Sequence, residues 1–324
     1  MATNQKYKQS DEDCQAKQRL AQKLPDIAGK LAAGLLIGAA ATALGTFLYA
    51  HFATHPARRK IYKNPGHYGL KFEDVKFLTE DGLLLHGWFL PAKSEPKAVV
   101  IVAHGYPANR EDMLPHAIIL QKAGYACLMF DFRAHGHSEG KISSAGSAET
   151  LDMIAALDYL ETRSDIRHLS VGVLGQSMGA AVAIMTAAKD ERIKAVAAEA
   201  SYPHLQDALE ARFRFVLGRG SKLIALPVKW WAQKWMDFEP QDVSPINDVG
   251  RIGPRAVLII QGQHDLLVRW QDGAALYAAA QEPRDIWLLK RAGHAGCLKD
   301  SPTEYARRIT AFFDRHLAAQ IEES

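Results

Sequence analysis

Residues 169–187 read LSVGVLGQSMGAAVAIMTA, and this stretch decides the fold prediction. An apolar run typical of a buried strand leads directly into Gly175-Gln-Ser177-Met-Gly179, and a run of small residues typical of a closely packed helix follows. A sharp turn between a strand and a helix holds a serine hydroxyl out at the edge of a sheet. Glycines flank such a serine because the backbone is strained and the helix approaches the strand closely. The stretch therefore predicts a strand–turn–helix unit with Ser177 as candidate nucleophile.

The same Gly-x-Ser-x-Gly pattern occurs a second time, at Gly136-His-Ser138-Glu-Gly140, so the pattern alone does not identify a nucleophile. Ser138 comes after the polar end of its strand and runs into Lys141-Ile-Ser-Ser, which is typical of a loop. Ser177 follows an apolar strand at once and precedes a helix. The context therefore assigns the nucleophile to Ser177 and a loop position to Ser138.

Strands and helices alternate along most of the chain after residue 70. A hairpin comes first, because Glu80-Asp81-Gly82 is a turn signal between two strand-like runs. Strands that alternate with helices predict an α/β fold, with a mostly parallel sheet and helices on both of its faces. The expected strands are 75–78, 83–89, 98–103, 125–130, 169–174, 193–198, 256–261 and 285–289, and the expected helices are 113–123, 147–162, 178–188 and 305–317.

The segment 201–254 interrupts this alternation for about fifty residues, which is too long for a structureless loop in a compact domain. It is rich in large apolar side chains, namely Phe213, Phe215, Leu223, Leu226, Trp230, Trp231 and Trp235. Trp231 and Trp235 are four residues apart and would share one face of a helix. We expect a helical cap over one end of the sheet, whose aromatic side chains pack the cap, line an acyl pocket or touch a bilayer.

The N-terminal region changes composition abruptly. Residues 1–30 are polar and predict a disordered or loosely helical tail. The twenty residues 31–50, LAAGLLIGAAATALGTFLYA, carry no charge, and a helix of that length spans about 30 Å, the thickness of a bilayer's hydrocarbon core. Tyr49 lies near the end of the run, where its ring favours the interface. We expect a single-pass transmembrane anchor over 31–53 and a folded domain over 65–320.

Two alternatives to an anchor stay open. The first is a cleaved signal peptide, because Ala41-Thr-Ala43 offers a signal-peptidase site. However, the charged segment 1–30 that precedes the apolar run is long, and the apolar run exceeds that of an ordinary signal peptide. A buried helix of a soluble protein would need protein cover on all of its faces. Basic residues flank the run on both sides, so the positive-inside rule does not set the orientation. Gly34-x-x-x-Gly38 resembles the packing motif of paired membrane helices, but the motif is weak in a run this rich in Ala and Gly.

Composition excludes several classes of protein. The 39 Lys and Arg against 36 Asp and Glu leave a net charge of +3, too balanced for a protein that coats nucleic acid. The 48% hydrophobic and 23% charged residues exclude wholesale disorder. Cys14, Cys127 and Cys297 are scattered and odd in number, which excludes a disulfide framework, and no C-x-x-C pair suggests a zinc site.

A serine hydroxyl needs a neighbouring base, itself oriented by a carboxylate, to act as a nucleophile at neutral pH. In sheets with this turn, the order along the chain is serine, acid, histidine. Asp265 follows the strand 256–261 and His294 follows the last strand, so both lie at the strand ends that carry Ser177. We expect His294 as base and Asp265 as orienting acid. Glu199 is the reserve acid, and its alternative role is that of a buried, hydrogen-bonded carboxylate.

Acyl transfer also needs preorganised donors for the oxyanion of the tetrahedral intermediate. One expected donor is the backbone N–H of Met178, the residue after the nucleophile. The other is the N–H of Tyr106, because the loop His104-Gly105-Tyr106 follows a buried strand and its glycine lets the backbone turn inward. Cys297 lies near the expected site, but we interpret it as a structural thiol because Ser177 already fills the nucleophile role.

Together these motifs resemble the α/β-hydrolase superfamily over about residues 70–318. The matching pieces are His104-Gly105, Asp131 to Gly140, Gly175 to Gly179, Gly262 to Asp265 and Gly293-His294. Within the superfamily the chain is similar to serine hydrolases with a short N-terminal membrane anchor. Ala134 departs from the pattern, since such proteins often have Gly there. A serine rather than an aspartate at 177 argues against haloalkane dehalogenases and epoxide hydrolases.

The resemblance implies a serine hydrolase that cleaves carboxylic ester, thioester or amide bonds through an acyl-enzyme, without a cofactor or metal ion. The expected partners are a small-molecule or lipid-like acyl substrate and a membrane contacted through residues 31–53, and no nucleic acid. An acyltransferase with the same triad and a non-catalytic binding protein on the same fold are the alternatives.

Overall fold

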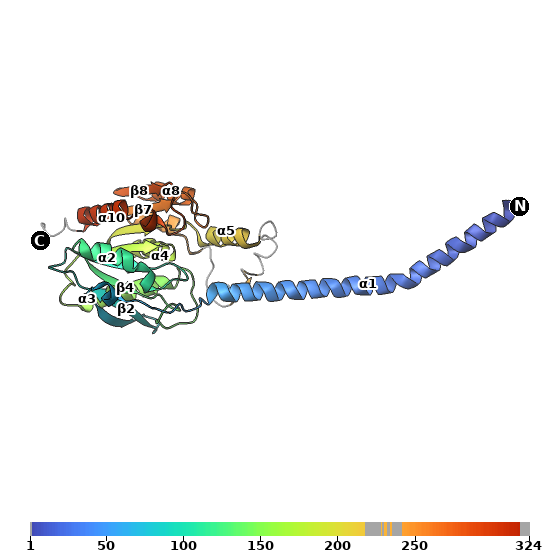
Figure 1. Ribbon diagram of the computed structural model, residues 1–324, viewed down its shortest axis with the longest axis horizontal. Coiled ribbons are helices and arrows are strands. Elements are labelled where there is room, and N and C mark those ends of the chain that lie inside the picture. The colour runs from blue at the N-terminus through green and yellow to red at the C-terminus, as the bar shows by residue number, and fades with distance from the viewer. Residues whose placement is uncertain (1, 218–227, 229, 232–233, 235–241, 318–324) are drawn as a thin grey trace.

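The computed structural model describes residues 2–217, 228, 230–231, 234 and 242–317, and Figure 1 presents them as a rounded body from which one long helix projects. The body is built on one eight-stranded sheet with the order β1-β2-β4-β3-β5-β6-β7-β8. The strands are β1 (Glu73–Leu78), β2 (Leu84–Leu90), β3 (Val99–Ala103), β4 (Ala126–Phe130), β5 (Val171–Gln176), β6 (Ile193–Glu199), β7 (Ala256–Gly262) and β8 (Arg284–Leu289).

The sheet has the predicted directions. β1 pairs antiparallel with β2, and β2 pairs antiparallel with β4. The pairs from β4 through β3, β5, β6 and β7 to β8 are parallel. The mostly parallel α/β sheet is therefore confirmed. Its parallel strands all end at one edge, which brings together the residues that follow β3, β5, β7 and β8.

Helices cover both faces of this sheet, and two separate cores result. The helices are α2 (Leu114–Lys122), α3 (Glu149–Thr162), α4 (Met178–Ala187), α5 (Leu205–Leu217), α7 (Pro245–Asp248), α8 (Trp270–Ala279), α9 (Cys297–Asp300) and α10 (Pro302–His316), with 3-10 turns at Pro65–Tyr68, Arg110–Met113 and Val249–Arg251. In β3, Ile101 packs into the core with α3, α4 and α8, whereas Val100 packs into the core with α2 and α10. This alternation is the two-residue period of a strand buried on both sides.

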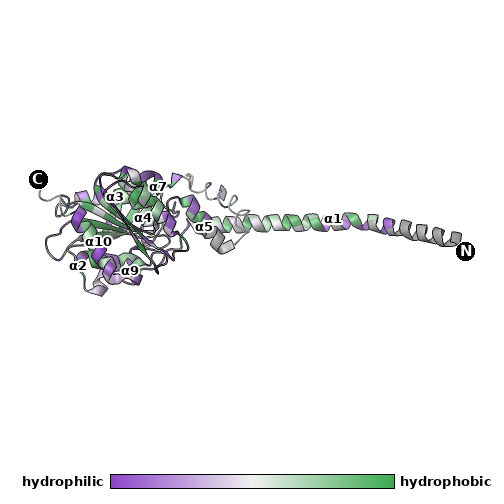
Figure 2. Cartoon of the chain, turned by 90° about the horizontal axis from the view of Figure 1, so that it is seen from above, coloured by the Kyte–Doolittle hydropathy of each residue, from purple (hydrophilic) through white to green (hydrophobic). Residues whose placement is uncertain are grey.

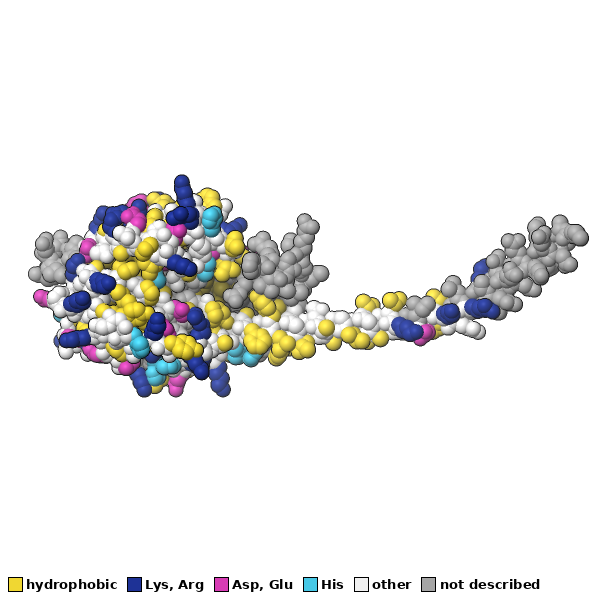
Figure 3. Space-filling model, in the orientation of Figure 1, with side chains coloured by type: hydrophobic (Ala, Val, Ile, Leu, Met, Phe, Trp, Pro, Cys, Tyr) yellow, Lys and Arg dark blue, Asp and Glu magenta, His cyan; other side chains and the backbone are white. Residues whose placement is uncertain are grey.

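The helix α1 (Ala2–Thr54) combines the expected tail and the apolar run into one element, so residues 2–30 are helical in the structure. Figure 2 shows the hydrophobic stretch of α1 next to the body, and in Figure 3 its hydrophobic side chains face outward. The helix from Ala21 to Thr54 is long and apolar enough to cross a membrane, and only 6% of its most apolar stretch of 18 residues is buried. Thr46, Ala50 and Thr54 are buried, and their spacing of four marks the side that packs against the body.

The segment expected to form the cap contains the helix α5, which follows β6 along the chain. Trp230 and Trp231 are in contact with each other, with ring centroids 4.6 Å apart. Leu223, Leu226 and Trp235 lie outside the described residues, so their predicted positions in the cap stay predictions. The helix α8 is an addition to the sequence prediction, which had no element between residues 265 and 285.

Candidate active site

Ser177 occupies the sharp turn between β5 and α4, with φ 53° and ψ −115°. A side chain on Gly175 would come within 2.3 Å of the Gly179 carbonyl oxygen. One on Gly179 would come within 2.4 Å of the Ala103 carbonyl oxygen at the end of β3. Both glycines are therefore required by close backbone approach, which is why this turn can place a serine at the carboxyl edge of the sheet.

The structure brings the three residues singled out in the sequence into one hydrogen-bonded chain. His294 Nε2 lies 3.0 Å from Ser177 Oγ, and His294 Nδ1 lies 2.8 Å from Asp265 Oδ2. The Asp265 side chain is fully buried, whereas 24% of the His294 side chain is exposed. The imidazole thus connects a buried carboxylate with a hydroxyl at the mouth of a pocket, and this geometry suits proton transfer away from the hydroxyl.

Asp265 is held in place by donors that sequence reasoning missed. Its Oδ1 accepts the backbone N–H groups of Leu267, at 2.8 Å, and Val268, at 2.9 Å. Gln261 Nε2 donates to its Oδ2 at 3.2 Å. The signal for the first two bonds is local, because an aspartate at the start of a turn accepts N–H groups two and three residues further on. These bonds fix the direction in which the carboxylate meets His294.

The loops that carry Asp265 and His294 touch each other. The backbone N–H of His264 donates to the Ala292 carbonyl at 3.0 Å. A side chain on Gly262 would come within 2.3 Å of that same carbonyl oxygen. The glycine that ends β7 therefore lets the loop that carries His294 approach the loop that carries Asp265 closely.

The loop after β3 passes directly beside the serine. A side chain on Gly105 would lie 3.0 Å from Ser177 Cβ, so any larger residue there would press against the serine and force a small shift. Tyr106 and Met178 both line the pocket above Ser177 and His294. This places the two residues expected to supply oxyanion donors beside the hydroxyl, and their role as donors stays a prediction.

His104 connects this loop with the loop that contains the second Gly-x-Ser-x-Gly pattern. Its Nε2 accepts the backbone N–H of Phe132 at 3.0 Å, which leaves the proton on Nδ1 to be donated to the Gly105 carbonyl at 2.8 Å. Complete burial lowers the pKa of His104 to about 4, because the charged imidazolium would lose its hydration. His104 is therefore neutral at physiological pH and acts as a fixed link between the two loops.

Ser138 occupies a different environment from Ser177. Its side chain is buried, and its Oγ donates to the Asp131 carbonyl at 2.6 Å and accepts the N–H of His86 at 2.9 Å. A side chain on Gly136 would come within 2.1 Å of Asp131 Oδ2. The hydroxyl joins a loop to β2, as the prediction of a loop serine requires.

Glu199 and Cys297 lie behind the site and are fully buried. Glu199 accepts the Tyr305 hydroxyl at 2.8 Å and the backbone N–H of Cys297 at 3.1 Å. Burial alone would disfavour its charge, but the nearby His116 and these donors outweigh burial and lower the pKa of Glu199. Glu199 thus has the hydrogen bonds of a structural carboxylate. Burial raises the pKa of the Cys297 thiol, which makes it unreactive.

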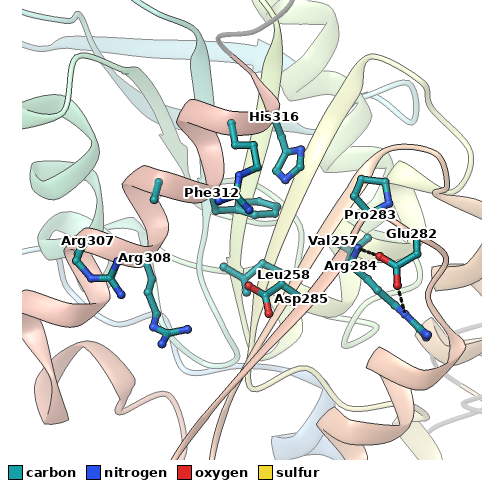
Figure 4. Close-up of a pocket in the computed structure, with 12 residues that line it drawn as sticks. Val257, Leu258, Glu282, Pro283, Arg284, Asp285, Arg307, Arg308, Phe312 and His316 are labelled. Carbon is teal, nitrogen blue, oxygen red and sulfur yellow. Dashed lines mark hydrogen bonds and ion pairs between the residues drawn. The ribbon is translucent and has the colours of Figure 1, made fainter.

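The pocket above Ser177 has a volume of about 130 Å³ and lies at the carboxyl edge of the sheet. A larger groove of about 420 Å³ lies between β8 and α10 (Figure 4). That groove is lined by Val257 and Arg284, at the amino ends of β7 and β8, and so lies at the opposite edge. Open α/β sheets bind ligands outside the carboxyl ends of their strands, which favours the smaller pocket. Among the residues that the structure describes, no group of three or more His, Cys, Asp or Glu side chains is arranged to hold a metal ion.

Comparison with known proteins agrees with this architecture. Residues 98–222 match a family model described as the alpha/beta hydrolase fold. The uncharacterized protein YfhR of Salmonella typhimurium is 30% identical over 68% of this chain and 74% of its own length. The esterase Pf2001 of Pyrococcus furiosus is 27% identical, with a TM-score of 0.68 over 81% of this chain and 99% of the esterase. This likeness supports a function of the hydrolase or acyltransferase type. The chain belongs to the α/β-hydrolase family.

Proposed function

We propose that the protein is a membrane-anchored serine hydrolase that cleaves carboxylic esters through a covalent acyl-enzyme. One observation carries the proposal, namely the hydrogen-bonded chain from Asp265 through His294 to Ser177. It combines a nucleophile, a base and an orienting acid in the order that acyl transfer requires. Thioesters and amides react by the same steps and are the wider substrate class.

The chemistry follows from the positions of the protons. His294 Nε2 accepts the proton of the Ser177 hydroxyl while Oγ forms a bond to the acyl carbon. The resulting imidazolium donates that proton to the leaving oxygen as the ester C–O bond breaks. Water then gives a proton to His294 and attacks the acyl-enzyme, and the proton returns to Ser177 as the acid leaves. Asp265 stabilises the imidazolium in both halves and holds its ring in place.

In this mechanism the carbonyl oxygen becomes an oxyanion beside the backbone of Tyr106 and Met178. The close approach of Gly105 to Ser177 supports this assignment, because the loop that carries Tyr106 passes next to the serine and Met178 directly follows it in the chain. Two such donors, fixed before the reaction, stabilise developing charge without any reorganisation.

Anchoring through residues 31–53 is the second part of the proposal. Leu35, Leu36 and Ile37 are 76%, 71% and 70% exposed, which is costly for a helix in water. A membrane would cover these side chains. Extraction of membranes with alkaline carbonate tests the anchor. The full-length chain should stay in the membrane pellet with its N-terminal residues intact. Cleavage after residue 43 would support a signal peptide, and release of the uncleaved chain would support a soluble helix.

The hydrolase proposal is tested with a fluorophosphonate probe and a p-nitrophenyl ester. The wild-type protein should label at Ser177 and hydrolyse the ester. Ser177→Ala should abolish labelling and lower kcat on the order of 10⁴-fold or more. A folded wild-type protein that neither labels nor hydrolyses any ester would support a non-catalytic binding protein instead.

An acyltransferase is the second candidate, because the chain is 24% identical over 76% of its length to the polyketide transferase ATR5 of Stachybotrys chlorohalonatus. Both reactions share the acyl-enzyme and differ only in the acceptor. Product analysis with and without an added alcohol separates them. Release of free acid at the same rate in both cases supports hydrolysis.

A further inference from the structure

The end of α1 forms part of the wall of the pocket above Ser177. Tyr49 and Ala53 line that pocket from α1, and Leu205, Ala208 and Leu209 line it from α5. Tyr49 and Leu209 also pack against the small apolar cluster of Ala50 and Val228, which joins α1 to the cap. The proposed anchor is therefore also a component of the proposed active site.

Hydrogen bonds fix α1 in this position. The Tyr106 hydroxyl donates to the Phe52 carbonyl at 3.0 Å, and the Ser143 N–H donates to the Thr54 carbonyl at 2.8 Å. These bonds satisfy carbonyls at the C-terminal end of the helix, where intrahelical donors are missing. Arg58 then donates to the carbonyls of Gly136, at 3.1 Å, and Gly140, at 2.7 Å. The chain is thus attached to the catalytic body on both sides of the helix end.

The pocket wall lies at the expected surface of the bilayer. The apolar run 31–50 accounts for about 30 Å of helix, so Tyr49 and Ala53 fall at its boundary. The cap meets α1 at the same level, since the Trp231 and Phe47 rings are 5.1 Å apart and Trp230 is 51% exposed. Exposed tryptophan at such a level is typical of a membrane interface.

The pocket is also too small for a long acyl chain. Pockets that enclose a drug-sized ligand measure about 300–1,000 Å³, against about 130 Å³ here. The reacting end of an ester fits, but a long chain must leave the pocket. A chain that leaves the pocket past the apolar side chains of α1 and α5 would meet the lowest cost of burial. This route, called the exit below, would lead toward the expected surface of the bilayer.

We propose that the substrate is a membrane-resident, long-chain ester whose acyl chain lies between α1 and α5, with Tyr49 and Ala53 as specificity-determining residues. This inference rests on the proposed serine hydrolase function. It names a substrate class and assigns to the anchor a part in substrate selection as well as in attachment.

The experiment uses the full-length protein in phosphatidylcholine–detergent mixed micelles with two substrates. p-Nitrophenyl acetate needs only the pocket itself, whereas 4-methylumbelliferyl oleate needs the exit. Ala53→Trp fills the exit and should lower kcat/KM for the oleate at least about tenfold, with the acetate value changed less than about twofold. Leu48→Trp is the matched control, because it adds the same ring on the exposed side of α1, and it should leave both values unchanged.

Several results would overturn the inference. One is an Ala53→Trp variant in which the ratio of kcat/KM for the oleate to kcat/KM for the acetate is unchanged. Another is a Leu48→Trp variant that loses as much kcat/KM for the oleate as Ala53→Trp does. If Ala53→Trp labels poorly with fluorophosphonate and so has a damaged nucleophile, Tyr49→Ala decides instead. That variant widens the exit and should raise the ratio, and an unchanged ratio contradicts the inference. A wild type that hydrolyses the acetate but not the oleate also contradicts it, while the hydrolase proposal stands. A wild type inactive on both substrates and unlabelled removes the proposed function and the inference with it.

Discussion

The two Gly-x-Ser-x-Gly turns of this chain have the same five-residue pattern but different surroundings. At Ser177 the turn joins a parallel strand to a helix, and the hydroxyl faces a pocket and a histidine. At Ser138 the turn lies in a loop, and both roles of the hydroxyl, donor and acceptor, are used by backbone groups. In both turns, glycines are needed because backbone or carboxylate atoms lie where a side chain would be. The glycines of the motif thus indicate only a tight turn. Whether the serine can act as a nucleophile is indicated by the groups around its hydroxyl.

Replacement of each serine by alanine tests this comparison and has the largest expected effect. Ser177→Ala should lower kcat on the order of 10⁴-fold with little change in the free energy of unfolding. Ser138→Ala should keep kcat within about twofold, but should lose about 1–3 kcal/mol of stability, because it leaves the His86 N–H and the Asp131 carbonyl without their buried partner. Ester hydrolysis and urea unfolding measure both quantities. The opposite pattern would exchange the roles of the two serines.

The glycines of the two turns should differ in how much stability is lost when each is replaced by alanine. Gly179→Ala puts a methyl group 2.4 Å from the Ala103 carbonyl oxygen, and the backbone must move, so we expect a loss of about 3 kcal/mol or more. Gly140→Ala meets its nearest atom at 3.2 Å, and the main cost is its φ of 91°, about 1–2 kcal/mol. Urea midpoints of the two variants give the comparison. Equal losses would mean that steric contact is not the difference between the turns.

The link through His104 should make stability depend on pH. In the unfolded chain this imidazole binds a proton below its ordinary pKa of 6.5, whereas burial lowers the folded pKa to about 4. The unfolded state therefore binds more protons between these values, and stability falls as the pH falls from about 6.5 to 4. At pH 5 the loss from His104 is about 2 kcal/mol relative to pH 7.5.

Urea unfolding at pH 7.5 and pH 5 measures this loss, and His104→Gln is the matched variant because its amide does not titrate. The His135 ring lies edge-to-face with the His104 ring, with centroids 5.1 Å apart, and burial lowers its pKa to about 4 as well. Part of the pH dependence therefore persists in the variant. We expect the drop in stability to be about 2 kcal/mol smaller in His104→Gln. An identical drop in both proteins would show that His104 is protonated in the folded state.

The smallest effect is expected at Ala134, in the loop before Ser138. This residue has a φ of 63°, a conformation that costs a residue with a side chain about 1–2 kcal/mol. Ala134→Gly removes that cost but stabilises the unfolded chain, through its greater conformational entropy, by about 0.4–1 kcal/mol, so a net gain of stability of up to about 1.6 kcal/mol is expected. Ala311→Gly, on the exposed side of α10, should instead lose about 1 kcal/mol. Thermal midpoints that fall in both variants would contradict a strained Ala134.

Much of this site could be predicted before the fold was known. Strands of a parallel sheet end at one edge, so an acid after β7 and a histidine after β8 had to lie near the serine after β5. The helix α8 cannot be predicted in this way, since its sequence WQDGAALYAA has only a short and mixed apolar pattern. The bonds from Leu267 and Val268 that orient Asp265 are local, and the turn that makes them was not recognised.

Patterns within the amino-acid sequence are enough to predict the sheet, the two tight turns, the candidate nucleophile with its base and acid, and the apolar run near the N-terminus. These are properties of neighbouring residues, because periodicity, glycine sterics and strand order act over short stretches of chain. Three contacts become visible only in the folded chain: α1 lines the pocket beside Ser177, Arg58 holds the loop of the second turn, and His104 joins both loops. Such contacts link residues that are distant in the chain. No local sequence pattern predicts them, because they depend on how the helices, strands and loops pack against one another.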